Sequence, residues 1–101
     1  MYLVQILIPR ADNSGNPFPK AEFDEVKEDL ANHFNGVTAY LQAPAEGLWR
    51  EGGRSSDDDI VIFEVMTAKV DLRDCRARRA GFERRFRQDR VIIRYMPIAL
   101  V

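Results

Sequence analysis

The chain has 101 residues, which matches one domain large enough to bury a core of its own. Hydrophobic residues make up 46% and charged residues 31%, and the net charge is −1, so a disordered or fibrous class is excluded. Cys75 is the only cysteine, which excludes an intramolecular disulfide. We expect a single domain over residues 1–101 in a reducing cytoplasm, the default compartment for such a chain.

The apolar run from Tyr2 to Pro9 predicts a first strand. It has no basic leader and no small-residue cleavage site, and it is too short to span a bilayer, so we expect neither export nor a membrane partner. Residues 10–18 are rich in turn formers and predict a long loop. Pro19 suits the first turn of a helix.

A first helix is predicted after Pro19, because apolar residues recur there at spacings of 3, 4 and 4. These residues are Phe23, Val26, Leu30 and Phe34. The pair Asn35-Gly36 is typical of a left-handed helix end, so a second strand is predicted from Val37 to Gln42. Turn formers then indicate a short extended piece at residues 48–50 and a mobile loop at residues 51–56.

The run from Asp59 to Thr67 is almost continuously apolar, which predicts a central third strand. Asp71 is expected to cap a second helix that ends near Gln88. Its inner stripe is predicted to hold Leu72, Cys75, Phe82 and Phe86. Arg90 to Met96 forms the predicted last strand.

Charge is distributed unevenly along the chain. Residues 1–66 carry 5 basic and 12 acidic side chains, and residues 67–101 carry 10 basic and 4 acidic ones. The first helix is therefore acidic and the second basic, and two such helices side by side largely cancel each other's field. We expect no nucleic-acid partner. The alternative is phosphate or nucleic-acid binding, and it would use Arg73, Arg76, Arg84 and Arg87.

The order strand-helix-strand-strand-helix-strand predicts an α+β fold, a ferredoxin-like βαββαβ sandwich with a four-stranded antiparallel sheet and two helices on one face. The first and third predicted strands are apolar on both sides, so the uncovered face of the sheet needs a partner. We expect a homodimer that pairs through the sheet. The alternative is a cover made by residues 43–56 or by the last residues of the same chain.

Three polar residues interrupt these apolar strands: Gln5, Glu64 and Arg94. On the uncovered face they would form a polar cluster in which Arg94 neutralises Glu64 and Gln5 bridges them, with Thr38, Tyr40 and Gln42 nearby. A desolvated Glu64 is a candidate general base or acid. The competing interpretation is a structural ion pair that fixes the register of the dimer.

Other residues are weaker candidates. Arg79 falls within the inner stripe of the second helix, where it either extends out to solvent or holds an anion. Trp49 either lines the mouth of a pocket or packs on the rim of the sheet. His33 is expected at a helix end and Asp57 to Asp59 in a turn, so no metal ligand and no cofactor is predicted.

The arrangement of apolar segments resembles the dimeric α+β barrel superfamily. The segments Gly36 to Thr38, Gly47 to Arg50, Ser55 or Ser56, and Phe86 to Val91 are similar to the pattern of a family of small bacterial domains without assigned chemistry. Other members of the superfamily are small monooxygenases and isomerases. The haem-degrading type needs His, Asn and Trp, which His33, Asn32 and Trp49 match in type but not in spacing, and Tyr2 excludes the tautomerases with a proline at that place.

Two functions follow from this reading. The first is a ligand-binding or interaction module without catalysis. The second is a cofactor-independent monooxygenase or isomerase that acts on a small planar organic acid, with Glu64 as base, Arg79 or Arg94 on the acid group, and Tyr40 and Trp49 as walls. An enzyme needs a pocket of roughly 300 Å³ or more that reaches Glu64, whereas in a module that region is filled.

Overall fold

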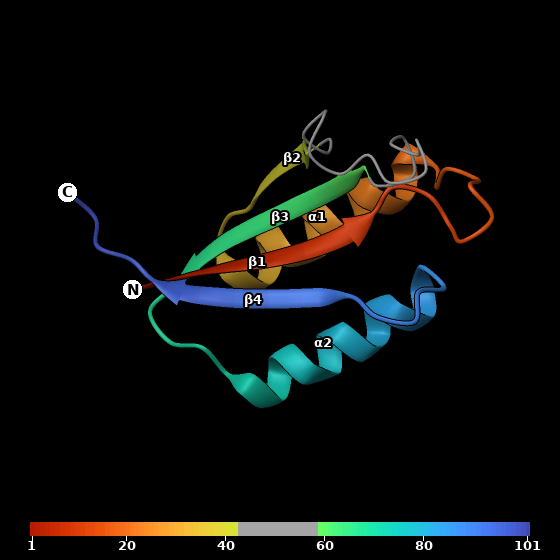
Figure 1. Ribbon diagram of the computed structural model, residues 1–101. Helices are drawn as coiled ribbons and strands as arrows, with labels where there is room; N and C mark the ends of the chain where they lie inside the picture. Colours follow the sequence, from red (N-terminus) through yellow and green to blue (C-terminus); the bar gives the residue numbers. More distant parts are fainter. Residues whose placement is uncertain (43–58) are drawn as a thin grey trace, which may run out of the picture.

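The computed structural model describes residues 1–42 and 59–101, and the predictions that fall on residues 43–58 lie outside it. The elements in chain order are β1 (Tyr2–Pro9), α1 (Lys20–Phe34), β2 (Thr38–Gln42), β3 (Ile60–Thr67), α2 (Leu72–Arg85) and β4 (Ile92–Pro97). The strands form one antiparallel sheet in the order β2-β3-β1-β4 (Figure 1). This α+β arrangement is compatible with a ferredoxin-like fold.

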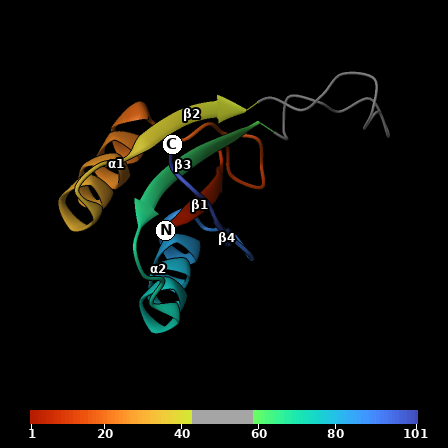
Figure 2. The ribbon, with the colours of Figure 1, turned by 90° about the vertical axis from the view of Figure 1, so that its left-hand side faces the viewer.

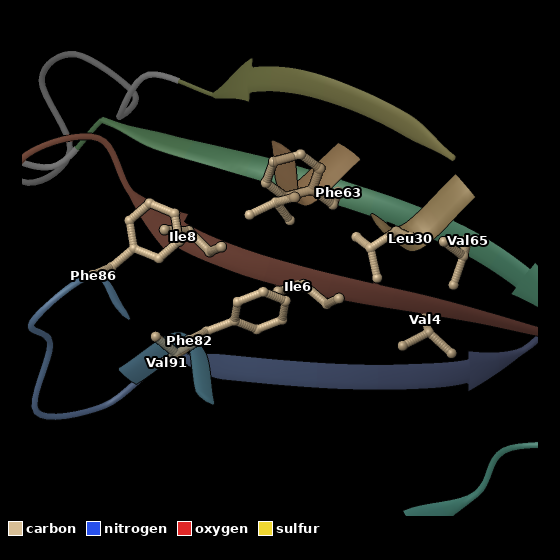
Figure 3. Packing of buried hydrophobic residues seen from close by; sticks show 10 residues of the cluster. Val4, Ile6, Ile8, Leu30, Phe63, Val65, Phe82, Phe86 and Val91 are labelled. Carbon is tan, nitrogen blue, oxygen red and sulfur yellow. The ribbon is translucent and has the colours of Figure 1, made fainter. Parts of the chain in front are cut away.

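Both helices pack on the same face of the sheet (Figure 2). Alternate residues of β1 point to that face, because side chains alternate along a strand. The core there is built from Val4, Ile6, Ile8, Phe63 and Val65 of the sheet, Val26 and Leu30 of α1, Phe82 of α2 and Phe86, the C-cap residue of α2 (Figure 3). Each of these side chains is buried. The apolar side chains that recur every second residue in the strands and every three or four residues in the helices therefore pack together in one layer.

The helices begin and end close to the residues that were predicted to cap them. Pro19 is the N-cap of α1, so the helix begins one residue later, and Asn35 ends it in the left-handed conformation with φ 67°. The Asp71 carboxylate caps α2 by accepting a hydrogen bond from the backbone N–H of Asp74 at 3.1 Å. The second helix ends before Gln88, because Arg87 has φ 50° and turns the chain toward β4.

The long loop between β1 and α1 is organised around Asp12. Its carboxylate accepts hydrogen bonds from the backbone N–H groups of Ser14 and Asn16, both at 2.9 Å. These bonds, that of Asn16 above all, lower the pKa of the Asp12 carboxyl. The loop returns the chain so that the Phe18 ring packs edge-on against Phe86, with ring centroids 5.1 Å apart.

The predicted inner stripe of α2 is correct for Phe82 and Phe86 and wrong for Leu72, which is 44% exposed. Leu72 is the first residue of the helix, where α2 has not yet reached the sheet (Figure 1). The oppositely charged helices are connected as expected, since Arg85 Nε lies 3.2 Å from Glu22 Oε1.

Candidate functional site

The face of the sheet opposite the helices carries three matched levels of side chains. We define the open face by the residues on these levels, which are Ile62, Leu7 and Ile92, then Glu64, Gln5 and Arg94, then Met66, Leu3 and Met96, together with Thr38 and Tyr40 of β2. Each level runs from β3 across β1 to β4. The open face is thus apolar at two levels and polar at the one between them.

A chain of hydrogen bonds runs across the middle level. Arg94 Nε donates to Gln5 Oε1 at 2.7 Å, and Gln5 Nε2 donates to Glu64 Oε2 at 2.6 Å. The hydroxyl of Tyr40 donates to the same Glu64 oxygen at 2.8 Å. We call Arg94, Gln5, Glu64 and Tyr40 the polar row.

The orientation of the Gln5 amide follows from the chemistry of its two neighbours in the polar row. Arginine only donates and an ionised carboxylate only accepts, so the Gln5 amide must turn its oxygen to Arg94 and its nitrogen to Glu64. Gln5 is 7% exposed and both of its side-chain ends are hydrogen-bonded. Within the described ranges, neither the Nη atoms of Arg94 nor Oε1 of Glu64 makes a hydrogen bond, so the row presents unused donors at one end and an unused acceptor at the other.

The structure brings Gln5, Glu64, Arg94 and Tyr40 together, as the sequence analysis expected. Gln5 bridges Arg94 and Glu64 as expected, with one hydrogen bond to each. The reason is the strand order, because β1 lies between β3 and β4 and keeps the two charges apart. Tyr40 joins the row diagonally, since its backbone is level with Ile62.

Tyr40 is held in its protonated form by this arrangement. The hydrogen bond from its hydroxyl to the Glu64 carboxylate raises the pKa of Tyr40 above its ordinary value, and the nearby negative charge acts in the same direction. Tyr40 therefore acts as a hydrogen-bond donor at neutral pH, and not as a base.

The apolar levels of the open face are partly exposed. The exposed fractions are 52% for Met66, 49% for Ile92 and 40% for Met96, whereas Ile62 is buried. The exposed apolar surface therefore lies along β4 and at the Met66 end of β3. Large hydrophobic side chains grouped in this way are typical of an interaction surface.

A cavity of about 390 Å³ reaches Glu64. Its other walls are Leu3, Thr38, Val65, Met66 and residues 34–37, beside the part of β3 that β2 does not pair. This volume satisfies the size expected of a small-molecule pocket at Glu64.

Two predicted site residues do not join the polar row. Arg79 is exposed on α2, which covers the other face of the sheet, and it makes no ion pair or hydrogen bond with any described residue. The side chain of Arg79 thus extends out to solvent, whereas Arg78 pairs with Asp74 at 2.8 Å. The role of Arg79 as a ligand-binding residue stays a prediction. Trp49 lies outside the described residues.

Sequence reasoning missed a second cavity, of about 470 Å³, between the end of α1 and the start of α2. Its walls include His33, Asp74 and Cys75. Burial, and secondarily the Asp74 carboxylate, raises the pKa of the Cys75 thiol, so this sulfur is a poor nucleophile near neutral pH. No local motif announces this cavity, because His33 and Cys75 are far apart in the sequence and meet only when the helices dock.

The four arginines of the phosphate-binding alternative are all exposed. Arg87 lies 3.9 Å from Asp12, and no other ion pair within the described ranges involves these four residues. The absence of a nucleic-acid partner remains a prediction.

The chain matches no protein-family model, no curated protein and no solved structure. The resemblance to dimeric α+β barrels therefore rests on architecture alone. No helix among the described residues combines the length and the apolar character needed to cross a membrane.

Proposed function

We propose that this chain is an interaction module that works as a homodimer, with the open face as its interface. The cavity at Glu64 meets the size criterion for an enzyme pocket, so a catalytic function is kept as the second candidate. The observation that carries the proposal is the open face itself, where two apolar levels flank a hydrogen-bonded polar row. Met66, Ile92 and Met96 remain about half exposed in the single chain. Burial of such side chains contributes about 25 cal/mol per Å² of apolar surface removed from water.

A second copy of the chain fits this face better than an unrelated cover. Sheets pack face to face at about 10 Å, with their strands roughly aligned, when both inner faces are apolar. Closed two-fold dimers are the commonest soluble oligomers, and they use the same patch on both partners. The polar row adds specificity to such an interface, because buried polar groups penalise registers that leave them unpaired.

The proposal is tested with two lysine substitutions of exposed apolar residues. Met66→Lys places a charge on the open face, whereas Leu72→Lys places one on α2, where the native side chain is exposed to a similar extent. In sedimentation velocity at micromolar concentrations we expect wild type and Leu72→Lys to run as dimers and Met66→Lys as a monomer. A monomeric wild type, or equal behaviour of the two variants, contradicts the proposal.

A second candidate function is favoured by the cavity at Glu64. In a small enzyme that acts on a planar organic acid, Glu64 Oε1 would take a proton from the ligand while the Nη atoms of Arg94 hold its acid group. Tyr40 and Gln5 would fix the carboxylate through Oε2. The Nη donors of Arg94 would bind a ligand in this function and a partner chain in the first. The group that binds to Arg94 therefore distinguishes the two functions.

Benzoate is a suitable probe for this second function, since it is a planar organic acid. In ¹⁵N NMR spectra, millimolar benzoate should shift the Gln5 side-chain amide signals saturably, because Gln5 is hydrogen-bonded to Arg94, and Arg94→Met should abolish the effect. Arg79→Met is the matched control, because Arg79 lies on the other side of the molecule. Shifts that are absent, or that are equal in the two variants, exclude an acid site at the polar row.

A further inference from the structure

On the open face, β3 and β4 carry matching residue types on either side of β1 except at the middle level, although Ile92 is 49% exposed and Ile62 only 1%. At the outer levels β3 and β4 carry the same residue, Ile62 with Ile92 and Met66 with Met96. At the middle level they carry opposite charges, Glu64 on β3 and Arg94 on β4. Both strands run antiparallel to β1, so the motifs Ile-x-Glu-x-Met and Ile-x-Arg-x-Met run in the same direction.

We propose that two chains pair about a two-fold axis parallel to β1, so that Arg94 of each chain meets Glu64 of the other. This inference rests on the proposed homodimer and specifies its geometry. Rotation about such an axis exchanges the β3 side of one sheet with the β4 side of the other. It places methionine over methionine and arginine over glutamate, and it brings Ile92 to the level of an isoleucine that is already buried in its own chain.

The distances are consistent with this pairing. Neighbouring strands are about 4.8 Å apart, so Glu64 and Arg94 lie at about equal distances on either side of Gln5. The rotation therefore brings the two charges into opposition when Gln5 lies on the axis. Arginine and glutamate side chains are long enough to meet across sheets about 10 Å apart.

The unused atoms of the polar row support the same geometry. Among residues 1–42 and 59–101, the hydrogen bond within the row uses Arg94 Nε and leaves the Nη atoms to a partner, while Glu64 keeps Oε1 as an acceptor. Two interchain ion pairs would complete a closed network of both rows. An axis that runs across the strands would instead place arginine on arginine and glutamate on glutamate, which is repulsive.

Ile62 adds little to the apolar surface that the dimer would bury. It is already buried, so the additional burial comes from Ile92, Met66 and Met96. The two methionines are flexible and adapt to a partner's surface. Their pairing at one end of the axis is the apolar part of the interface that the proposed geometry forms anew.

The test uses two variants with rows of a single sign. Arg94→Glu has an acidic row and Glu64→Arg a basic one, so neither can pair with itself, and each should lose dimer affinity by on the order of a hundredfold. Mixed in equal amounts, they should form a heterodimer with about the affinity of the wild-type homodimer. Arg76→Glu on the exposed side of α2 is the control and should leave the dimer intact.

The mixture avoids a common ambiguity of charge-reversal experiments. Within each single variant the row is like-charged, so recovery on mixing cannot arise inside one chain. Circular dichroism of each variant shows whether it folds, and a pair of neutral variants, Arg94→Gln and Glu64→Gln, replaces any variant that does not. Each neutral variant should weaken the homodimer.

The outcomes separate the two proposals. A monomeric wild type overturns the homodimer itself. A dimeric wild type whose two charge variants fail to combine overturns the proposed axis alone. A heterodimer much tighter than wild type, or a strengthened Arg94→Gln homodimer, indicates the axis across the strands and also overturns this inference.

Discussion

Replacement of Gln5 by methionine tests the polar row directly. Methionine has a similar volume and keeps the packing of β1, but it removes the acceptor for Arg94 and one donor for Glu64. A buried hydrogen bond to a charged group contributes about 1.5–3 kcal/mol to stability. Arg94 is exposed and Glu64 half-buried, so water replaces part of the loss.

We therefore expect Gln5→Met to lower the free energy of unfolding by about 2 kcal/mol. For a domain of this size, each kcal/mol corresponds to roughly 4–8 °C in Tm. Urea unfolding followed by circular dichroism, at one fixed protein concentration, measures the change as a shift in midpoint with an unchanged slope. Asn32→Met on the exposed side of α1 is the control and should change stability by less than about 0.5 kcal/mol.

The triple variant Gln5→Met, Glu64→Met, Arg94→Met completes this test. Removal of all three polar partners leaves no unpaired charge, so the triple variant should be more stable than Gln5→Met alone. A Gln5→Met protein as stable as wild type, or a triple variant less stable than the single one, refutes the reasoning about the row.

Further predictions concern single groups. Glu64→Gln should lower the pKa of Tyr40 toward its ordinary value of 10.0, as measured by ultraviolet titration. Because this pKa is raised on folding, its contribution to stability is complete below pH 10.0 and is lost as the pH rises through the folded value; a Tyr40→Phe protein without a flatter alkaline stability curve contradicts this. Phe86→Ala should cost about 3–5 kcal/mol in urea unfolding, since the ring is fully buried, and a loss below about 1 kcal/mol contradicts the core assignment. Asp71→Ala should lower the free energy of unfolding by about 1 kcal/mol through the lost N-cap, and an unchanged stability contradicts the cap assignment. Cys75 should react with iodoacetamide more slowly in the folded protein than in urea at the same pH, and equal rates contradict its raised pKa.

Local patterns predicted most of the fold. The first strand, Tyr2–Pro9, was predicted with its observed bounds, because an apolar run bounded by turn formers leaves little choice. The caps Asn35 and Asp71 were predicted because each residue type satisfies a specific backbone need at a helix end. The face that Gln5, Glu64 and Arg94 share followed from the two-residue period of a strand.

What sequence reasoning could not supply depends on how the elements dock. The Gln5 bridge was predicted, but strand pairing sets the register that places Arg94, Gln5 and Glu64 at one level, and no local pattern contains that register. Arg79 was placed in a stripe by its helical angle, but only the contact between α2 and β4 shows that it faces solvent. The match between β3 and β4 became visible only when the sheet order placed both beside β1.

Protection of methyl groups from a soluble paramagnetic probe is the most direct test of the central claim that two chains pair through the open face. In the single chain, Met66 and Met96 are 52% and 40% exposed, and Leu72 on α2 is 44% exposed. In protein labelled at its methionine and leucine methyls, we expect the probe to broaden the Leu72 signals while the Met66 and Met96 signals stay sharp. Equal broadening of all three residues would contradict the account.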